Sequence, residues 1–124
     1  MYDRHVLGKQ GEDEVKKYLL NNGYKILERN YYCKVGELDI IALDKDEFVF
    51  IEVKTRSQNI FGTPAEAVDK NKKSHIYRTA EYYVAKAGIE NRKMRFDVIE
   101  VKERDDKIFI NQIKNAIIDR PWGR

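Results

Sequence analysis

The feature that most constrains the fold is the stretch GELDIIALDKDEFVFIEVKTR, residues 36–56. It contains two apolar segments separated by a short polar turn, which is the pattern of a β-hairpin. Both faces of the second segment begin apolar, so we expect it to be a central strand covered on both sides. Yet Asp39 interrupts the first segment, and Glu52 and Lys54 end the second. A sheet that buries these strands must also accommodate two carboxylates and an ammonium group.

Hydrophobic periodicity, turn residues and helix caps predict helices before and after this hairpin and strands on either side of it. The order α-β-β-β-α-β-β predicts an α/β fold with a mixed β-sheet of about five strands flanked by helices. The second helix is expected to make a right-handed crossover, so that the fourth strand lies parallel to an earlier one. The expected elements are a helix over 4–22, strands over 24–32, 36–44 and 47–55, a helix from Thr63 to Gly88 with a break near Asp69, and strands over 93–102 and 107–113.

Length and composition limit the classes of protein that this chain can represent. Its 124 residues suffice for one hydrophobic core, so we expect a single domain over 1–118 and a C-terminal tail over 119–124. A net charge of +3 is compatible with a polyanionic partner but does not argue for one. The single cysteine, Cys33, excludes an internal disulfide, and with two histidines it cannot build a Cys/His zinc site. No segment reaches the length of a membrane span, and we expect a cytoplasmic protein.

The charged residues of the hairpin form a pattern with chemical meaning. Side chains alternate across a strand, so Glu52 and Lys54 share one face, and a hairpin can place Asp39 beside Glu52, although the sequence does not fix the register. Two adjacent carboxylates repel each other and are costly to bury, and a divalent cation such as Mg²⁺ relieves both effects. Metal-assisted hydrolysis of a phosphodiester needs these groups. The alternative is a buried ion pair without a metal, which contributes little stability.

A third acid is expected to lie near this pair. On a helical wheel, Glu12 borders the arc that Val15 and Leu19 bury. Gly8 and Gly11 in the same helix each cost about 1 kcal/mol relative to alanine, which makes sense if another segment approaches the helix closely. From the wheel alone, Glu12 is equally well interpreted as an ordinary residue at the edge of the buried face.

Several motifs together resemble the YraN-like family of bacterial proteins. They are GKQGEDEVKKYLLNNGYKILERNYYCKVGELDIIALD, FVFIEVKTRS, FGTPAEAV and MRFDVIEV, and they extend from about Gly8 to Ile117. That family is placed in the PD-(D/E)XK nuclease superfamily, which has a restriction-endonuclease-like fold, and it is similar in outline to archaeal Holliday-junction resolvases, which are Mg²⁺-dependent homodimers. The resemblance implies that Asp39, Glu52 and Lys54 are the catalytic acid, acid and lysine. It also implies that Glu12 is a metal ligand with Asp39 and Glu52, and that Mn²⁺ can substitute for Mg²⁺.

Other residues at matching positions have less defined roles. Glu37 shares the face of Asp39 and is expected to support it or to cap a neighbouring backbone group. Lys72 can reach a phosphate near the site, or it is a solvated lysine. Arg95 and Asp97 are expected to form a structural ion pair. The candidate contacts to the nucleic-acid backbone are Arg56, Lys70, Lys72, Lys73, Arg78 and Arg92, and the aromatic residues considered for an interface or for base stacking are Tyr31, Tyr32, Tyr77 and Trp122.

These features favour a metal-dependent endonuclease that cuts DNA, with branched or otherwise structured DNA as the expected substrate, because no sequence-reading motif is visible. The first alternative is a nucleic-acid-binding or adaptor protein that has the nuclease fold without useful catalysis. Hydrolysis of a small phosphate ester ranks last, because the sequence has no glycine-rich nucleotide loop. The expected partners are DNA and a second copy of the chain, with no membrane.

Overall fold

The computed structural model describes the backbone of residues 4–57 and 70–116, and the side chains of residues 10–55 and 72–116. The described elements are α1 (Arg4–Asn21), β1 (Lys25–Cys33), β2 (Gly36–Asp44), β3 (Glu47–Ser57), α2 (Lys70–Ala87), β4 (Lys93–Arg104) and β5 (Lys107–Ile113). The predicted order of helices and strands is therefore confirmed. The predicted helix start at Thr63, the break near Asp69 and the tail over 119–124 lie outside the described residues, and the domain boundary at 118 stays a prediction.

The five strands form one mixed sheet in the order β1-β2-β3-β4-β5. The hairpin strands β2 and β3 pair antiparallel, while β3 and β4 pair parallel, as a crossover through α2 requires. The two charged turns are tight, and residues Lys45, Asp105 and Asp106 adopt the positive φ values that short hairpin turns need. The strand that ends in Glu52 and Lys54 therefore lies at the centre of the sheet, as the sequence predicts.

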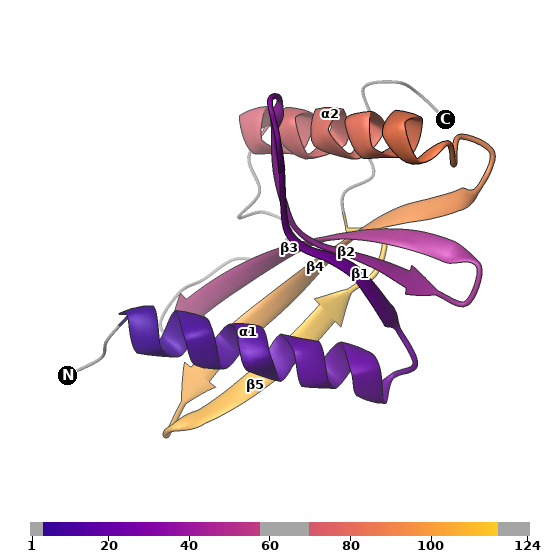
Figure 1. The fold of residues 1–124 in the computed structure, drawn as a ribbon. Helices are drawn as coiled ribbons and strands as arrows, with labels where there is room; N and C mark the ends of the chain where they lie inside the picture. The colour runs from indigo at the N-terminus through magenta and orange to yellow at the C-terminus, as the bar shows by residue number, and fades with distance from the viewer. Residues whose placement is uncertain (1–3, 58–69, 117–124) are drawn as a thin grey trace.

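A helix covers each face of the sheet, so the fold has three layers (Figure 1). On one face, α2 packs Ile76 and Ala80 against Phe50 and Phe96. On the other face, α1 packs Val15 and Leu19 against side chains of the central strands, which include Ile40, Val49, Ile51 and Ile99. Burial of apolar surface on both faces stabilises the two hydrophobic cores.

Two glycines allow close approach between layers. A Cβ on Gly11 would lie 3.3 Å from Cγ1 of Val101, which explains a glycine within α1. A Cβ on Gly36 would lie 2.6 Å from Oγ1 of Thr79, and the φ of Gly36 is +154°. The end of the β1–β2 hairpin therefore lies directly against α2 (Figure 1). The edge-to-face contact of Tyr31 with Tyr83, at 5.2 Å between ring centroids, adds to this packing.

One expected surface aromatic is a core residue. Tyr77 is 1% exposed and stacks edge-to-face on Phe96 from α2. The expectation that it could contact a partner was therefore wrong, because its position on α2 faces the sheet. Tyr32 is 77% exposed, near the end of the β1–β2 hairpin. Trp122 lies outside the described residues.

Candidate functional site

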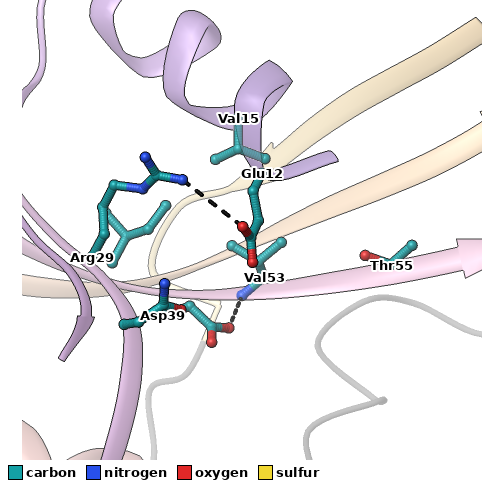
Figure 2. A pocket seen from close by; sticks show the side chains of 8 residues that line it. Glu12, Val15, Arg29, Asp39, Val53 and Thr55 are labelled. Carbon is teal, nitrogen blue, oxygen red and sulfur yellow. Dashed lines mark hydrogen bonds and ion pairs between the residues drawn. The ribbon is translucent and has the colours of Figure 1, made fainter. Parts of the chain in front are cut away.

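The hairpin strands separate at Asp39, and this separation creates the candidate site. Backbone pairing between β2 and β3 runs from Asp44 and Glu47 to Ile40 and Ile51. At the next position, the Asp39 carboxylate accepts a hydrogen bond of 2.7 Å from the backbone N–H of Val53 (Figure 2). A side chain thus occupies the place where the next strand-to-strand hydrogen bond would form.

Asp39 and Glu52 interact closely, as the hairpin pattern predicts. Burial and the negative charge of Glu52 raise the pKa of Asp39 to about 7, although the Val53 hydrogen bond and the charge of Lys72 act in the opposite direction. Asp39 is therefore partly protonated at neutral pH. The apolar strands hold two carboxylates closer together than their charges favour.

Two lysines balance the charge of Glu52. The Glu52 carboxylate is only 4% exposed, and its Oε2 lies 3.1 Å from Nζ of Lys72 on α2 and 3.7 Å from Nζ of Lys54. Burial alone would lower the pKa of Lys72, but the hydrogen bond and charge of Glu52, with the charges of Asp39 and Glu37, outweigh it and raise that pKa. The ammonium group of Lys72 is thus held in its charged form beside the two acids.

Glu12 reaches the same region from the other side of the sheet. A pocket of about 150 Å³ lies where β1 and β2 leave β3, and α1 covers it. Glu12 and Asp39 both line it, and the carboxylate of Glu12 pairs with Arg29 at 3.9 Å (Figure 2). The residues that line the pocket are Glu12, Val15, Arg29, Asn30, Asp39, Ile40, Val53 and Thr55.

The carboxylates of the site provide part of the ligand set that a divalent cation needs. Asp39 and Glu52 supply adjacent hard oxygen donors, and Mg²⁺ is commonly held by one or two carboxylates. The raised pKa of Asp39 means that its ionised form is disfavoured as the site stands. A bound cation would stabilise the ionised carboxylate and lower that pKa. Among the residues that the structure describes, no three Asp, Glu, His or Cys side chains gather closely enough to form a metal-ligand cluster. Glu12 as the third ligand stays a prediction.

The remaining predicted residues occupy different places. Glu37 is exposed and acts on Lys72 through its charge. Lys73 is half-buried and Arg78 is exposed, both on α2, whereas Arg92 lies over the ring of Phe48, near the opposite end of β3. The side chains of Arg56 and Lys70 lie outside the described residues.

Sequence reasoning missed two charged residues near the site. Arg29 lines the pocket, but its position in β1 follows from pairing that the sequence does not fix. Glu100 is 5% exposed, and its backbone pairs with Lys54 across the parallel strands. The sequence contained a pattern that could have identified Glu100: Phe96, Val98 and Glu100 share a face of β4, just as Phe50 and Glu52 share a face of β3. An acid that ends an apolar strand face is the common pattern.

Comparison with known proteins relates most of this chain to one family. The model of UPF0102, described as an uncharacterised protein family, matches residues 11–109. A UPF0102 protein of Caldanaerobacter subterraneus is 41% identical over 115 residues, which cover 93% of this chain and 94% of that protein. A UPF0102 protein of Clostridium botulinum strain 657 is 50% identical over 118 residues, which cover 93% of this chain and 96% of that protein.

A solved structure gives a more distant match. Pyrococcus furiosus SfsA, in a structure described as a complex with Ca²⁺, matches with a TM-score of 0.44 and 12% sequence identity. The match covers 90% of this chain and 63% of that chain. In the part of this chain that the structure describes, no helix is long and apolar enough to cross a membrane.

Proposed function

The chain belongs to the UPF0102 family, which is the YraN-like group, and we propose that it is a metal-dependent endonuclease. It hydrolyses phosphodiester bonds in DNA, with branched or otherwise structured DNA as the preferred substrate. One observation carries this proposal: the half-buried Asp39 and the buried Glu52 lie together beside Lys54 where β2 leaves β3. An acid with a raised pKa beside a second carboxylate and a cation is typical of catalytic sites.

Each residue of this cluster has a distinct role in the proposed reaction. Asp39 and Glu52, with Glu12 as a third ligand, would hold Mg²⁺ or Mn²⁺. A metal bound there would polarise the phosphoryl group and lower the pKa of a water molecule. Lys54 holds the scissile phosphate or assists in deprotonating the attacking water. Lys72 orients the carboxylate of Glu52, since its ammonium lies 3.1 Å from that group.

Sequence-independent contacts to the phosphate backbone complete the proposal. Cationic side chains on α2 and at the end of β3 bind phosphates without reading bases. A symmetric dimer would bring two sites to two strands, which suits the cutting of a junction. The residues proposed for these contacts are Arg56, Lys70, Lys72 and Lys73.

A second candidate function is a nucleic-acid-binding adaptor without catalysis. A specific observation favours it: both Lys72 and Lys54 already pair with Glu52, so the protein itself supplies part of the charge that a metal would supply. An internally compensated cluster can persist as a structural remnant of a nuclease fold.

A cleavage assay separates the two functions. Wild type, Glu52→Gln and Glu14→Gln are incubated with Mg²⁺ or Mn²⁺ and labelled duplex, single strand, flap, nicked duplex and four-way junction. Glu14 is a matched control, because it is an acid of α1 that is 45% exposed and pairs with Lys17 at the surface. We expect Glu52→Gln to cut at least about 100-fold more slowly, since electrostatic stabilisation of a transition state is worth that much. Glu14→Gln should cut like wild type.

The outcomes of this assay are distinct. Equal cutting by wild type and Glu52→Gln would contradict the assignment of the site. Binding of the junction by wild type without cutting, in both metals, would support the adaptor instead.

A further inference from the structure

The backbone of β1 is unusual at the pocket. Asn30 has a φ of 53°, in the left-handed region that few residues other than glycine adopt readily. Consecutive side chains of a regular strand point to opposite faces, yet Arg29 and Asn30 both line the pocket. Arg29 pairs across the strands with Ile40 of β2, which also lines the pocket, so this register brings the Arg29 side chain to the pocket beside Asp39 (Figure 2).

Arg29 holds its partner there only weakly. Its guanidinium lies 3.9 Å from Oε2 of Glu12, and the two side chains are 35% and 56% exposed. Ion pairs of this length and exposure contribute between 0 and about 1 kcal/mol. Glu12 is the one ion-pair partner of Arg29 among the described residues. A guanidinium has five donors in a fork that matches two oxygens of a phosphate, so this single contact leaves most of its binding capacity unused.

The charges of the pocket make this capacity useful. Glu12 and Asp39 both repel an entering phosphodiester, and Arg29 is the one lysine or arginine among the residues that line the pocket. Val15, Ile40 and Val53 form an apolar part of its wall, which lowers the local dielectric and strengthens the attraction between opposite charges. An anion enters this pocket favourably only if a cation faces it.

We propose that Arg29 binds a phosphodiester of the nucleic-acid strand at this pocket, and that the phosphate replaces Glu12 as the partner of Arg29. The proposal rests on the proposed function in that it names a further substrate-binding residue of the same site. The exchange also frees the Glu12 carboxylate. Substrate binding and the availability of Glu12 are thereby coupled through one arginine.

The coupling has a test that needs no catalysis. Affinity for a labelled four-way junction and a labelled single strand is measured by fluorescence anisotropy in EDTA over a series of salt concentrations. The variants are Arg29→Gln, Arg29→Lys and Glu12→Gln. Lys93→Gln is the matched control, because Lys93 pairs with Asp46 at 3.7 Å on the surface, in the turn region near the start of β3 and β4.

Opposite effects of the two partners are the expected result. Arg29→Gln should weaken binding about tenfold, and its salt dependence should be shallower by about 0.9 on junction and about 0.7 on single strand. Arg29→Lys should fall between wild type and Arg29→Gln, because it keeps the charge and loses the fork. Glu12→Gln should strengthen binding several-fold, since it removes the competitor for Arg29. Lys93→Gln should bind like wild type.

A merely structural pair would behave differently. If Arg29 only anchored α1, Arg29→Gln and Glu12→Gln would shift the affinity in the same direction or not at all, and either result overturns the proposal. If Arg29→Gln does not fold, the affinity of Glu12→Gln is sufficient as a test. An affinity equal to or weaker than that of wild type would overturn the proposal.

Failure of this inference is separable from failure of the nuclease proposal. Opposite shifts in affinity without any cleavage by wild type would leave the role of Arg29 intact and reject the nuclease. Cleavage by wild type with unaltered binding by Arg29→Gln would reject the role of Arg29 alone. Absence of nucleic-acid binding by wild type in EDTA would overturn the role of Arg29.

Discussion

The two ends of the central strands bury charged residues in opposite ways. Near the start of β3 and β4, Arg95 donates hydrogen bonds to Asp97 at 3.1 Å, to Glu47 at 2.8 Å, to Asp44 at 3.1 Å and to the hydroxyl of Tyr24 at 2.6 Å. Near their other end, Asp39 and Glu52 repel each other, and the pKa of Asp39 is raised to about 7. The same sheet therefore contains one cluster in which an arginine and hydrogen bonds compensate the buried acids, and one in which two carboxylates face each other.

The difference lies in how completely hydrogen bonds satisfy each buried carboxylate. Asp97 has a fully buried side chain, and it accepts hydrogen bonds from Arg95, from Gln112 at 2.8 Å and from the backbone N–H of Asn115 at 3.0 Å. Asp39 accepts one from Val53 and faces another acid. A cluster whose acids accept several hydrogen bonds fixes the packing of strands, whereas a pair of carboxylates that face each other gains from an external cation.

The largest expected effect is on the compensated cluster. Arg95→Leu leaves Asp97 buried without its cation, and removing one partner of a buried ion pair costs about 3–5 kcal/mol. We expect the free energy of unfolding, measured by urea denaturation, to fall by about that amount. The exposed pair of Lys93 with Asp46 is the control, and Lys93→Gln should cost less than about 1 kcal/mol. Equal effects of the two variants would contradict the distinction.

A smaller effect of opposite sign is expected at Asp39. Its folded pKa is about 7 against 3.8 for the unfolded chain, so the folded state binds more protons between these values. The free energy of unfolding should therefore fall as pH rises from about 4 to about 7. Asp39→Asn removes this loss and keeps an acceptor for Val53, so at about pH 8 in EDTA it should be more stable than wild type by about 2 kcal/mol. This is half of the ~4 kcal/mol to which the difference between the two pKa values corresponds, because solvent screens the half-buried side chain of Asp39. At about pH 4 the two proteins should have similar stability.

Urea denaturation of both proteins across this pH range provides the check. An identical pH dependence in wild type and Asp39→Asn would show that the acid is as well compensated as Asp97. The comparison between the two ends of the sheet would then fail.

The smallest expected effect concerns Lys72. The positive charge of Lys72 lowers the pKa of Asp39, so Lys72→Gln should raise that pKa further. The pH at which wild type loses stability should move upward in this variant, and NMR titration of the Asp39 carboxyl carbon would follow the same change. Lys86→Gln is the control, because Lys86 lies in the last turn of the same helix. A downward shift of the Asp39 pKa in Lys72→Gln would contradict the charge arrangement.

Sequence predicted the features that depend on local pattern. The short turn between residues 44 and 47 and the alternation of side chains allowed Asp39 to lie beside Glu52, without fixing the register, and in the structure the two residues interact. The pair of Arg95 with Asp97 followed from their spacing of two residues within a strand. The order of elements followed from periodicity and turn residues.

Features that depend on non-local register were not predictable in this way. Arg29 lines the pocket because it pairs with Ile40 of β2, in a register that the sequence does not fix. The position of Glu100 beside Lys54 can be inferred only once the register of β3 with β4 is known. Tyr24 and Gln112 complete the Arg95 cluster from elements far apart in the chain.

The most direct test of the central claim is stabilisation of the protein by a divalent cation. Thermal unfolding is measured for wild type, Asp39→Asn and Asp46→Asn at about pH 8, with EDTA or with about 10 mM Mg²⁺ or Mn²⁺. Asp46 is the matched control, because it is an aspartate in the turn between β2 and β3 and its side chain is 70% exposed. A cation that binds only the folded state raises the melting temperature, by about 4 °C or more when it is well above its dissociation constant. We predict this rise in wild type and Asp46→Asn and its loss in Asp39→Asn; no rise in wild type, or an equal rise in Asp39→Asn, would contradict the account.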